Sequence, residues 1–326
     1  PGPLMASTSS EATDRLIVTF TERHTESAAH KIIASALSSF SSTWSIVNRP
    51  TARLPTSDFA LLDLRLPPLE RSRALSILRQ QSSIALIAPE WQYSKRHLLA
   101  PNSHHGGLED HGAGSHHGHT RPSTVSRLHA DALWRLGYRG HGVRVAVFDT
   151  GLVPNLPQLP NVVETLNWTD EEDANDQVGH GTFVASVIGA SDSEDVSANS
   201  CRGLAPESTL HIFKVFNSKQ LSYTSWFLDA FDYALHSEHK VHVLNLSIGG
   251  PDHSDLPFMR KVDEAVASNI ILVSGIGNSG PMWGTLMNPA DQSDVIGVGG
   301  VDDEGNLADF SSRGMTTWEL PDGYGR

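Results

Sequence analysis

Cysteine is nearly absent from this chain, and that absence limits how the fold can be held together. Cys201 is the only cysteine among 326 residues, so no intrachain disulfide can form and core packing must stabilise the structure. We interpret Cys201 as a small packing residue rather than a reactive thiol. Apolar runs are also short, since none approaches the roughly 20 residues that span a bilayer.

Basic residues are in the minority. The chain has 24 Lys and Arg against 37 Asp and Glu, which gives a formal net charge of −13. Because phosphate binding needs clustered cations, we expect no nucleic-acid partner. The first residues lack the charged and apolar regions of a secretory signal, and we expect residues 1–14 to be a disordered N-terminus. A hydrophobic content of 39% with 27 glycines is typical of a globular α/β protein.

Residues 15–99 predict a small α+β unit. Strand candidates at 16–20, 44–48, 58–64 and 83–88 alternate with helix candidates at 24–40 and 68–81. Pro68 suits the first turn of the second helix. The order β-α-β-β-α-β is typical of a ferredoxin-like sandwich. From the pattern alone, this unit could equally be an independent binding domain or a module that serves the domain behind it.

Residues 100–125 predict an exposed linker, because Gly, His, Ser and Pro dominate there without hydrophobic periodicity. A zinc or nickel site is conceivable, but histidines without a fixed scaffold more often form a solvated spacer, and we predict no metal site. The histidines concerned are His104, His105, His111, His116, His117 and His119.

Residues 126–326 alternate strand and helix signals. The strand candidates are mostly continuous apolar runs, as expected for a parallel sheet covered on both faces. This pattern predicts a doubly wound, mostly parallel α/β sheet whose functional residues gather at the carboxyl ends of the strands. The strands are expected at 144–149, 210–216, 241–248, 270–275 and 294–299, and the helices at 180–190, 224–237 and 257–268.

Three short motifs follow predicted strands or open a predicted helix, and together they suit acyl transfer. Asp149 ends the first strand, His180 opens a helix between two glycines, and Asn278 follows a later strand in a Gly-Asn turn. A carboxylate can orient a histidine, the histidine can activate a hydroxyl, and an amide can bind the oxyanion. Taken singly, each residue has a structural reading as a strand-end cap, a packed histidine or a turn asparagine.

The order of these motifs, with the segments around them, resembles the subtilase family of serine peptidases. The last segment is similar to a secretory-pathway branch of that family. The resemblance runs from about Trp134 to the final residue and rests on FDTGL (148–152), NWT (167–169), GHGTFVASVIGA (179–190), HIFKVF (211–216), SYTSWFLDAFDYA (222–234), VLNLSIGGPD (243–252), NPADQSDVIGVGG (288–300) and FSSRGMTTWELPDGYGR (310–326).

The resemblance implies a nucleophilic serine in a Gly-Thr-Ser-x-Ala segment, and no such segment precedes Arg326. Ser311 and Ser312 match a different family segment, the turn upstream of the nucleophile. We therefore expect this chain to be a fragment of an endopeptidase, a partial catalytic domain at 126–326, that does not hydrolyse peptides alone. The unit at 15–99 resembles the family's propeptide, an intramolecular inhibitor of a zymogen.

The resemblance also implies how a peptide substrate would bind. Subtilases hold the substrate as an extended strand between two edge segments, with a pocket for the residue before the cut. The matching edge residues are Lys219, Gln220, Leu221 and Ser222 on one side and Ser247, Ile248 and Gly249 on the other, with Gly275, Ile276 and Gly277 along the pocket.

Arg96-His97-Leu98-Leu99 follows the small unit and predicts a self-processing site. Members of the secretory-pathway branch favour Arg four residues before the cut and an aliphatic residue two before it. Arg96 and Leu98 meet both demands if the cut follows Leu99, and the partners implied are protein substrates with the same pattern. The alternative is a basic surface run without a role.

The resemblance further implies a lumenal protein of the endoplasmic reticulum or Golgi, with a membrane anchor in the full-length chain. Asn167 lies in an N-glycosylation sequon, which suits that compartment. Asn245 lies in another, but in a predicted buried strand, where we expect no glycan. The chemistry needs no cofactor. The acidic loop at 170–176 could hold structural Ca²⁺, although it lacks EF-hand spacing and a solvated loop is the preferred interpretation.

Two interpretations from other functional classes remain open at this point. The chain could be a naturally short, non-catalytic protein that binds substrates or folding partners. Alternatively, residues 15–99 could inhibit a separate protease. Coding sequence continuing into a Gly-Thr-Ser helix would favour the peptidase, and a stop codon after Arg326 would favour the binding protein.

Overall fold

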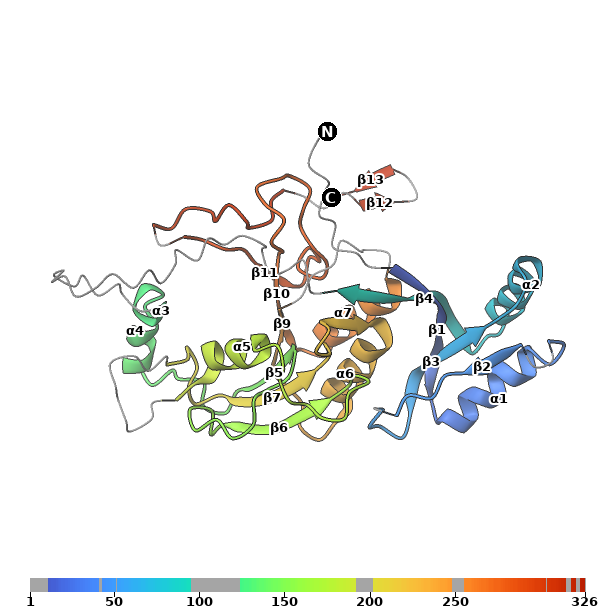
Figure 1. Ribbon diagram of the computed structural model, residues 1–326, viewed down its shortest axis with the longest axis horizontal. Coiled ribbons are helices and arrows are strands. Elements are labelled where there is room, and N and C mark those ends of the chain that lie inside the picture. The colour runs from blue at the N-terminus through green and yellow to red at the C-terminus, as the bar shows by residue number, and fades with distance from the viewer. Residues whose placement is uncertain are drawn as a thin grey trace.

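The first unit of the computed structural model is an antiparallel sheet with two helices on one face (Figure 1). Its strands lie in the order β2-β3-β1-β4, the ferredoxin-like order that the β-α-β-β-α-β pattern predicts. The structure describes residues 11–40, 43–50, 52–94, 124–191, 202–247, 255–302, 304–314, 318–320 and 323–325. The elements of the first unit are β1 (Glu11–His24), α1 (Glu26–Ala36), β2 (Trp44–Ile46), β3 (Ser57–Leu64), α2 (Pro68–Arg79) and β4 (Ile84–Ser94).

Local sequence explains the bounds of the two helices. The hydroxyl of Thr25 accepts the backbone N–H of Ala28 and so caps α1, while Pro68 occupies the first turn of α2. The neighbouring strands β1 and β4 are longer than predicted, because they pair with each other well beyond the apolar residues that indicated them. The hydrophobic core between the helices and the sheet includes Val18, Ile33 and Leu62, all fully buried.

The second unit is a parallel sheet of six strands in the order β11-β10-β9-β5-β7-β6. The predicted strands and helices are all present, and the doubly wound fold class is confirmed. β6 was missed, because its Val-Val-Glu-Thr-Leu-Asn sequence mixes polar and apolar residues at the sheet edge. The elements are α3 (Thr124–Arg127), α4 (Ala130–Arg135), β5 (Arg144–Asp149), β6 (Val162–Asn167), α5 (His180–Gly189), β7 (Thr209–Lys214), β8 (Leu221–Tyr223), α6 (Thr224–His236), β9 (Val243–Leu246), α7 (Leu256–Ala267), β10 (Ile271–Gly275), β11 (Ile296–Val298), β12 (Trp318–Leu320) and β13 (Gly323–Gly325).

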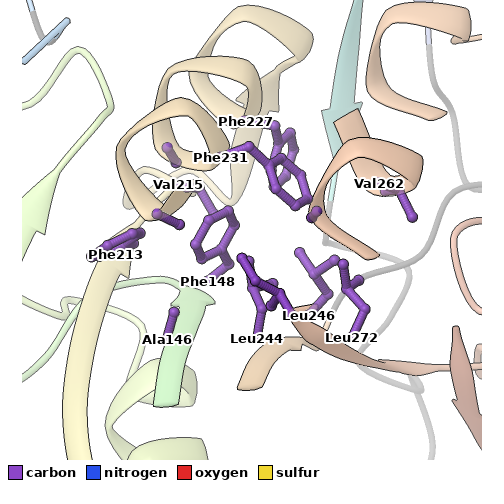
Figure 2. Packing of buried hydrophobic residues seen from close by; sticks show 14 of the residues in the cluster. Ala146, Phe148, Phe213, Val215, Phe227, Phe231, Leu244, Leu246, Val262 and Leu272 are labelled. Atoms are coloured by element: carbon purple, nitrogen blue, oxygen red, sulfur yellow. The ribbon is translucent and has the colours of Figure 1, made fainter. Parts of the chain in front are cut away.

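Helices cover both faces of this sheet, so successive residues of β5 pack in opposite directions. Val145 and Val147 belong to the cluster beneath α5, whereas Ala146 and Phe148 face α6 and α7. Figure 2 shows Phe148 rising from the sheet toward Phe231 of α6, and their ring centroids lie 5.1 Å apart. The sheet is thus the middle layer of three, and it holds the carboxyl end of β5 in a rigid frame.

The free face of the first sheet packs against α6 of the second unit (Figure 1). Ile17, Phe59 and Leu61 form a cluster with Leu228. β4 also pairs with β8 in antiparallel register, Tyr93 opposite Ser222, and so joins the two units through a backbone ladder. The first unit therefore docks on α6 through one apolar face and one strand pair.

Charged side chains ring this apolar contact. Arg23 of the first unit reaches Asp232 at 3.1 Å, and Arg49 binds Asp229. Lys261 is nearly buried and lies 2.7 Å from Asp58 of the first unit and 2.6 Å from Asp232. Desolvation opposes the charge of Lys261, but the surrounding carboxylates outweigh it and raise its pKa above the ordinary value. The docked arrangement therefore depends on buried ion pairs.

Candidate active site

Asp149 and His180 meet at the carboxyl end of β5. The Nδ1 atom of His180 lies 2.8 Å from Oδ1 and 2.9 Å from Oδ2 of Asp149. Asp149 is fully buried, whereas the imidazole is 26% exposed at the N-terminus of α5. A carboxylate in this place accepts the Nδ1 proton, which leaves Nε2 as the ring nitrogen that can accept a proton from another group.

Two glycines allow the strand end and the helix to approach so closely. A Cβ atom on Gly181 would lie 2.3 Å from the carbonyl oxygen of Gly151. A Cβ atom on Gly151, whose φ is +104°, would lie 2.2 Å from the carbonyl oxygen of Ala174. Both neighbours are backbone atoms that cannot give way, so only glycine fits at either position. The glycines flanking Asp149 and His180 therefore set the distance between the two side chains.

The turn that carries Asn278 follows β10 on the same edge of the sheet. β10 and β5 both pair with β9 in parallel, so their carboxyl ends lie on one side with β9 between them. Gly277 has φ +109° and would meet Met287 and Ser312 if it carried a Cβ atom. The Asn278 turn is thus a constrained backbone segment at the sheet edge where Asp149 ends β5.

Ser311 and Ser312 are buried and bonded to neighbouring backbone. The Ser311 hydroxyl accepts the N–H of Gly300 at 3.0 Å, and the Ser312 hydroxyl accepts the N–H of Ser279 at 3.1 Å. These bonds brace the segment around Asn278. Their geometry suits a structural turn, and the assignment of the segment as the turn upstream of a nucleophile stays a prediction.

The predicted substrate edge at residues 219–222 is present as a turn followed by β8. Lys219 is exposed, Gln220 has φ +61°, and Leu221 and Ser222 lie opposite Ser94 and Tyr93 of β4. This edge therefore accepts an antiparallel partner strand in the folded chain. Of the other predicted substrate-binding residues, Ser247 follows β9, Gly275 is the last residue of β10, and Ile276 and Gly277 follow that strand. Ile248 and Gly249 lie outside the described residues.

The acidic loop at 170–176 is anchored by side-chain contacts to the strand beside Asp149. Glu171 lies 2.7 Å from the buried Nζ atom of Lys214 and accepts the N–H of Ser218 at 2.8 Å. Burial alone would raise the pKa of Glu171, but the Lys214 and Ser218 donors lower it. Asp170 accepts a bond from Asn217. In the described part of the chain, no three His, Cys, Asp or Glu side chains form a group that could hold a metal ion.

Asn167, the predicted glycosylation site, is half-buried at the end of β6. Its amide nitrogen donates to the carbonyl oxygen of Glu171 at 2.5 Å, and its oxygen accepts from Thr169. The glycan assignment stays a prediction. The predicted self-processing residues Arg96, His97, Leu98 and Leu99, the histidines of the linker, and Cys201 all lie outside the residues that the structure describes.

Sequence reasoning missed two residues that hold this site together, Thr150 and Asp176. Thr150 is buried beside Asp149, and its hydroxyl accepts the N–H of Gly181 at 2.9 Å. Asp176 was grouped with the acidic loop, yet it bonds to both Thr150 and the first turn of α5. An acidic residue placed just before a predicted helix start was the available signal.

Comparison with known proteins gives the class to which this fold and site belong. The family model described as "Subtilase family" matches residues 140–321. The chain is 46% identical over 345 aligned residues to membrane-bound transcription factor site-1 protease from Homo sapiens, with 95% of this chain covered. It is 55% identical over 206 residues to subtilisin-like protease SBT6.1 from Arabidopsis thaliana, which covers 63% of this chain and 19% of that protein. The major intracellular serine protease of Bacillus subtilis is 36% identical over 202 residues, 59% of this chain and 61% of its own length.

The chain therefore belongs to the subtilase family, and it is similar to site-1 proteases. It spans about a third of the length of those relatives, 31% for the Homo sapiens protein. The name of the Homo sapiens relative describes that protein as membrane-bound. Within the described residues of this chain, helices are too short or too polar to cross one.

Proposed function

We propose that this chain contributes the acid, the base and the oxyanion donor of a serine endopeptidase of the site-1 protease type. The observation that carries the proposal is the 2.8 Å contact between His180 Nδ1 and the buried Asp149 carboxylate. The family membership supports it, because subtilases use this pair for acyl transfer. The nucleophilic serine comes from a Gly-Thr-Ser-x-Ala segment that the 326 residues do not contain.

In the proposed reaction the three groups have different tasks. Asp149 holds the His180 ring in the Nδ1–H tautomer and stabilises the imidazolium that forms. Nε2 of His180 removes the serine proton as the hydroxyl oxygen attacks the peptide carbonyl, and then gives that proton to the leaving amine. The side-chain amide of Asn278 donates to the oxyanion, and losing such a donor costs on the order of 3 kcal/mol of transition-state stabilisation.

The first unit acts as the intramolecular inhibitor and propeptide of this enzyme. The antiparallel pairing of β4 with β8 supports this role, because it joins the unit to the edge predicted to bind substrate. β4 ends at Ser94, two residues before Arg96. Self-processing after Leu99, and cleavage of other proteins after Arg-x-aliphatic-x sequences, complete the proposal. The predicted edge residues 219–222 and 247–249 bind the substrate backbone, and residues 275–277 line the pocket for the side chain before the cut.

The proposed setting is the lumen of the secretory pathway, with a membrane anchor in the whole protein and a glycan on Asn167. The similarity to proteins named membrane-bound supports this setting. The proposed chemistry needs no cofactor, and a structural Ca²⁺ near the acidic loop is compatible with it. Protein substrates are the proposed partners.

A comparison of two chains tests the proposal. The 326-residue chain and a longer chain extended through a Gly-Thr-Ser-x-Ala segment are incubated with a fluorogenic peptide carrying Arg four residues, and Leu two residues, before the scissile bond. Only the longer chain should turn over, and Arg→Ala in the peptide should abolish cleavage.

His180→Ala in the longer chain is the matched control and should remove turnover. Turnover by the 326-residue chain that His180→Ala abolishes would show that no further serine is needed. Absence of turnover in a folded, processed longer chain would reject the peptidase and favour the binding protein.

A further inference from the structure

Asp176 accepts five hydrogen bonds beside the candidate active site. Its Oδ1 atom accepts from the Thr150 hydroxyl at 2.8 Å, from Val178 N–H at 3.0 Å and from Gly179 N–H at 2.8 Å. Its Oδ2 atom accepts from the backbone N–H and the hydroxyl of Thr182 at 2.8 and 2.7 Å. Burial would raise the pKa of Asp176, but these donors outweigh it and lower the pKa. The side chain is therefore ionised near neutral pH.

This carboxylate supplies the N-terminal cap that α5 cannot supply for itself. The helices α1 and α7 are capped by their own N-cap side chains, Thr25 and Asp255. α5 has Gly179 at that position, which has no side chain to accept a bond. Asp176 reaches in from the preceding loop instead, and its negative charge is favourable at the positive end of the helix.

An ordinary N-cap side chain contacts only its own helix, whereas Asp176 also contacts the residue after β5. The Thr150 hydroxyl donates to Asp176 and at the same time accepts the N–H of Gly181. The backbone N–H of Thr150 donates to Asp149 Oδ1 at 2.8 Å. One carboxylate thus connects the residue after Asp149 with the residues on both sides of His180.

We propose that Asp176 is a positioning residue for His180. Asp176 holds the first turn of α5 and the end of β5 in the register that lets His180 meet Asp149. The proposal rests on the proposed function, since it names a residue that acts through the proposed base. A shift of about 1 Å between reacting groups costs on the order of 10²-fold in rate, so a small change in this register matters.

The test in the 326-residue chain uses the hydrogen-bonded Nδ1 proton of His180, observed by proton NMR with ¹⁵N-labelled histidine and assigned with His180→Gln. In the wild type this proton should be strongly deshielded and slow to exchange with solvent. Asp176→Asn replaces one acceptor oxygen by an NH₂ group that faces N–H donors. We expect exchange at least tenfold faster, or loss of the signal.

Three further variants separate positioning from stability. Thr150→Val removes the bridging hydroxyl and should weaken the signal, whereas Thr150→Ser keeps the hydroxyl and should restore it. Asp173→Asn in the same loop should change nothing, because the hydrogen bonds of Asp173 are local, to Asn175. An Asp176→Asn protein with a lower melting temperature but an unchanged His180 proton would overturn the proposal.

In the longer chain with its serine segment, Asp176→Asn should lower kcat by about 10²-fold while KM stays within about twofold, because substrate contacts are untouched. An unchanged kcat would also overturn the proposal. If the wild-type longer chain shows no turnover, the proposed function fails, but the NMR result still decides whether Asp176 positions His180.

Discussion

The candidate active site and the contact between the two units bury their carboxylates in different ways. Asp149 and Asp176 accept N–H and O–H donors, and most of these donors lie within 31 residues along the chain. At the contact, Asp58 and Asp232 meet the ammonium of Lys261, and Asp232 also meets Arg23, which is 209 residues away in sequence.

This difference has consequences for stability. A carboxylate that accepts several fixed donors keeps its geometry when the solution changes, because its partners are backbone N–H groups and short side chains of nearby residues. A buried ion pair between two units is costly to desolvate and costly to break, since removal of one partner leaves a buried charge alone. The geometry of the site should therefore change little with solution conditions. The stability of the contact between the units should depend on charge and pH.

Removing the buried cation beside the apolar contact should have the largest effect. Lys261→Met leaves the half-buried Asp58 and the buried Asp232 without their shared partner, and we expect the free energy of unfolding to fall by about 3–5 kcal/mol. Chemical denaturation of the whole chain measures this free energy of unfolding. Lys31→Met, at an exposed position on α1, is the control and should change the value by no more than about 0.5 kcal/mol. Equal effects of the two variants would contradict this account of the contact.

The matching change at the active site is Gly181→Ala. The added methyl group would lie 2.3 Å from the Gly151 carbonyl oxygen, so strand end and helix must separate. We expect a loss of about 2–3 kcal/mol in the free energy of unfolding and loss of the His180–Asp149 hydrogen bond by NMR. Gly275→Ala, whose Cβ would meet nothing within 4 Å, serves as the stability control. A retained His180–Asp149 bond would show that the glycine is not needed for the approach.

The contrast between local contacts at the site and distant contacts between the units also explains what the sequence could predict. Asp149 and His180 could be paired in advance, because the strand ending in Asp and the Gly-His-Gly helix start occur in the order that the subtilase resemblance implies. Each pattern taken alone also has a structural interpretation. The doubly wound sheet followed from continuous apolar runs such as residues 144–149 and 210–216. The ferredoxin-like unit followed from its alternation of strand and helix signals.

The packing of one unit on the other could not be predicted in this way. Arg23, Asp58 and Lys261 are individually ordinary surface-type residues, and only the docked fold brings them together. β8 is three residues long and gained its strand identity from pairing with β4 rather than from its own sequence. Interactions between elements distant in sequence leave no periodic signal in either one.

A pH series would sharpen the comparison at Asp229. Burial raises the pKa of Asp229 to about 7 even though Arg49 opposes the shift, and the nearby Asp232 and Asp58 add to the rise. In the unfolded chain the pKa lies near 3.8, so the folded state binds more protons between these values. The contribution of Asp229 to stability is therefore fully present in acid and is lost as pH rises through about 7.

The measurement is the difference in free energy of unfolding between wild type and Asp229→Asn, taken at pH 7.5 and 5.5. We expect that difference to shift in favour of the wild type by about 1–2 kcal/mol at the lower pH. The subtraction removes the pH dependence that the two proteins share. A shift in the opposite direction would mean that Arg49 keeps Asp229 ionised, and acid would then loosen rather than tighten the contact.

The smallest effect should come from an ion pair on the surface. Asp131 and Arg135 lie 3.0 Å apart at i,i+4 on α4, with side chains 44% and 74% exposed. Water screens both charges, so Asp131→Ala should lower the free energy of unfolding by no more than about 0.5 kcal/mol. This pair has the same chemistry as the buried pairs of Lys261 but lacks their desolvation. A loss above about 1.5 kcal/mol here would show that burial is not what separates the two regions.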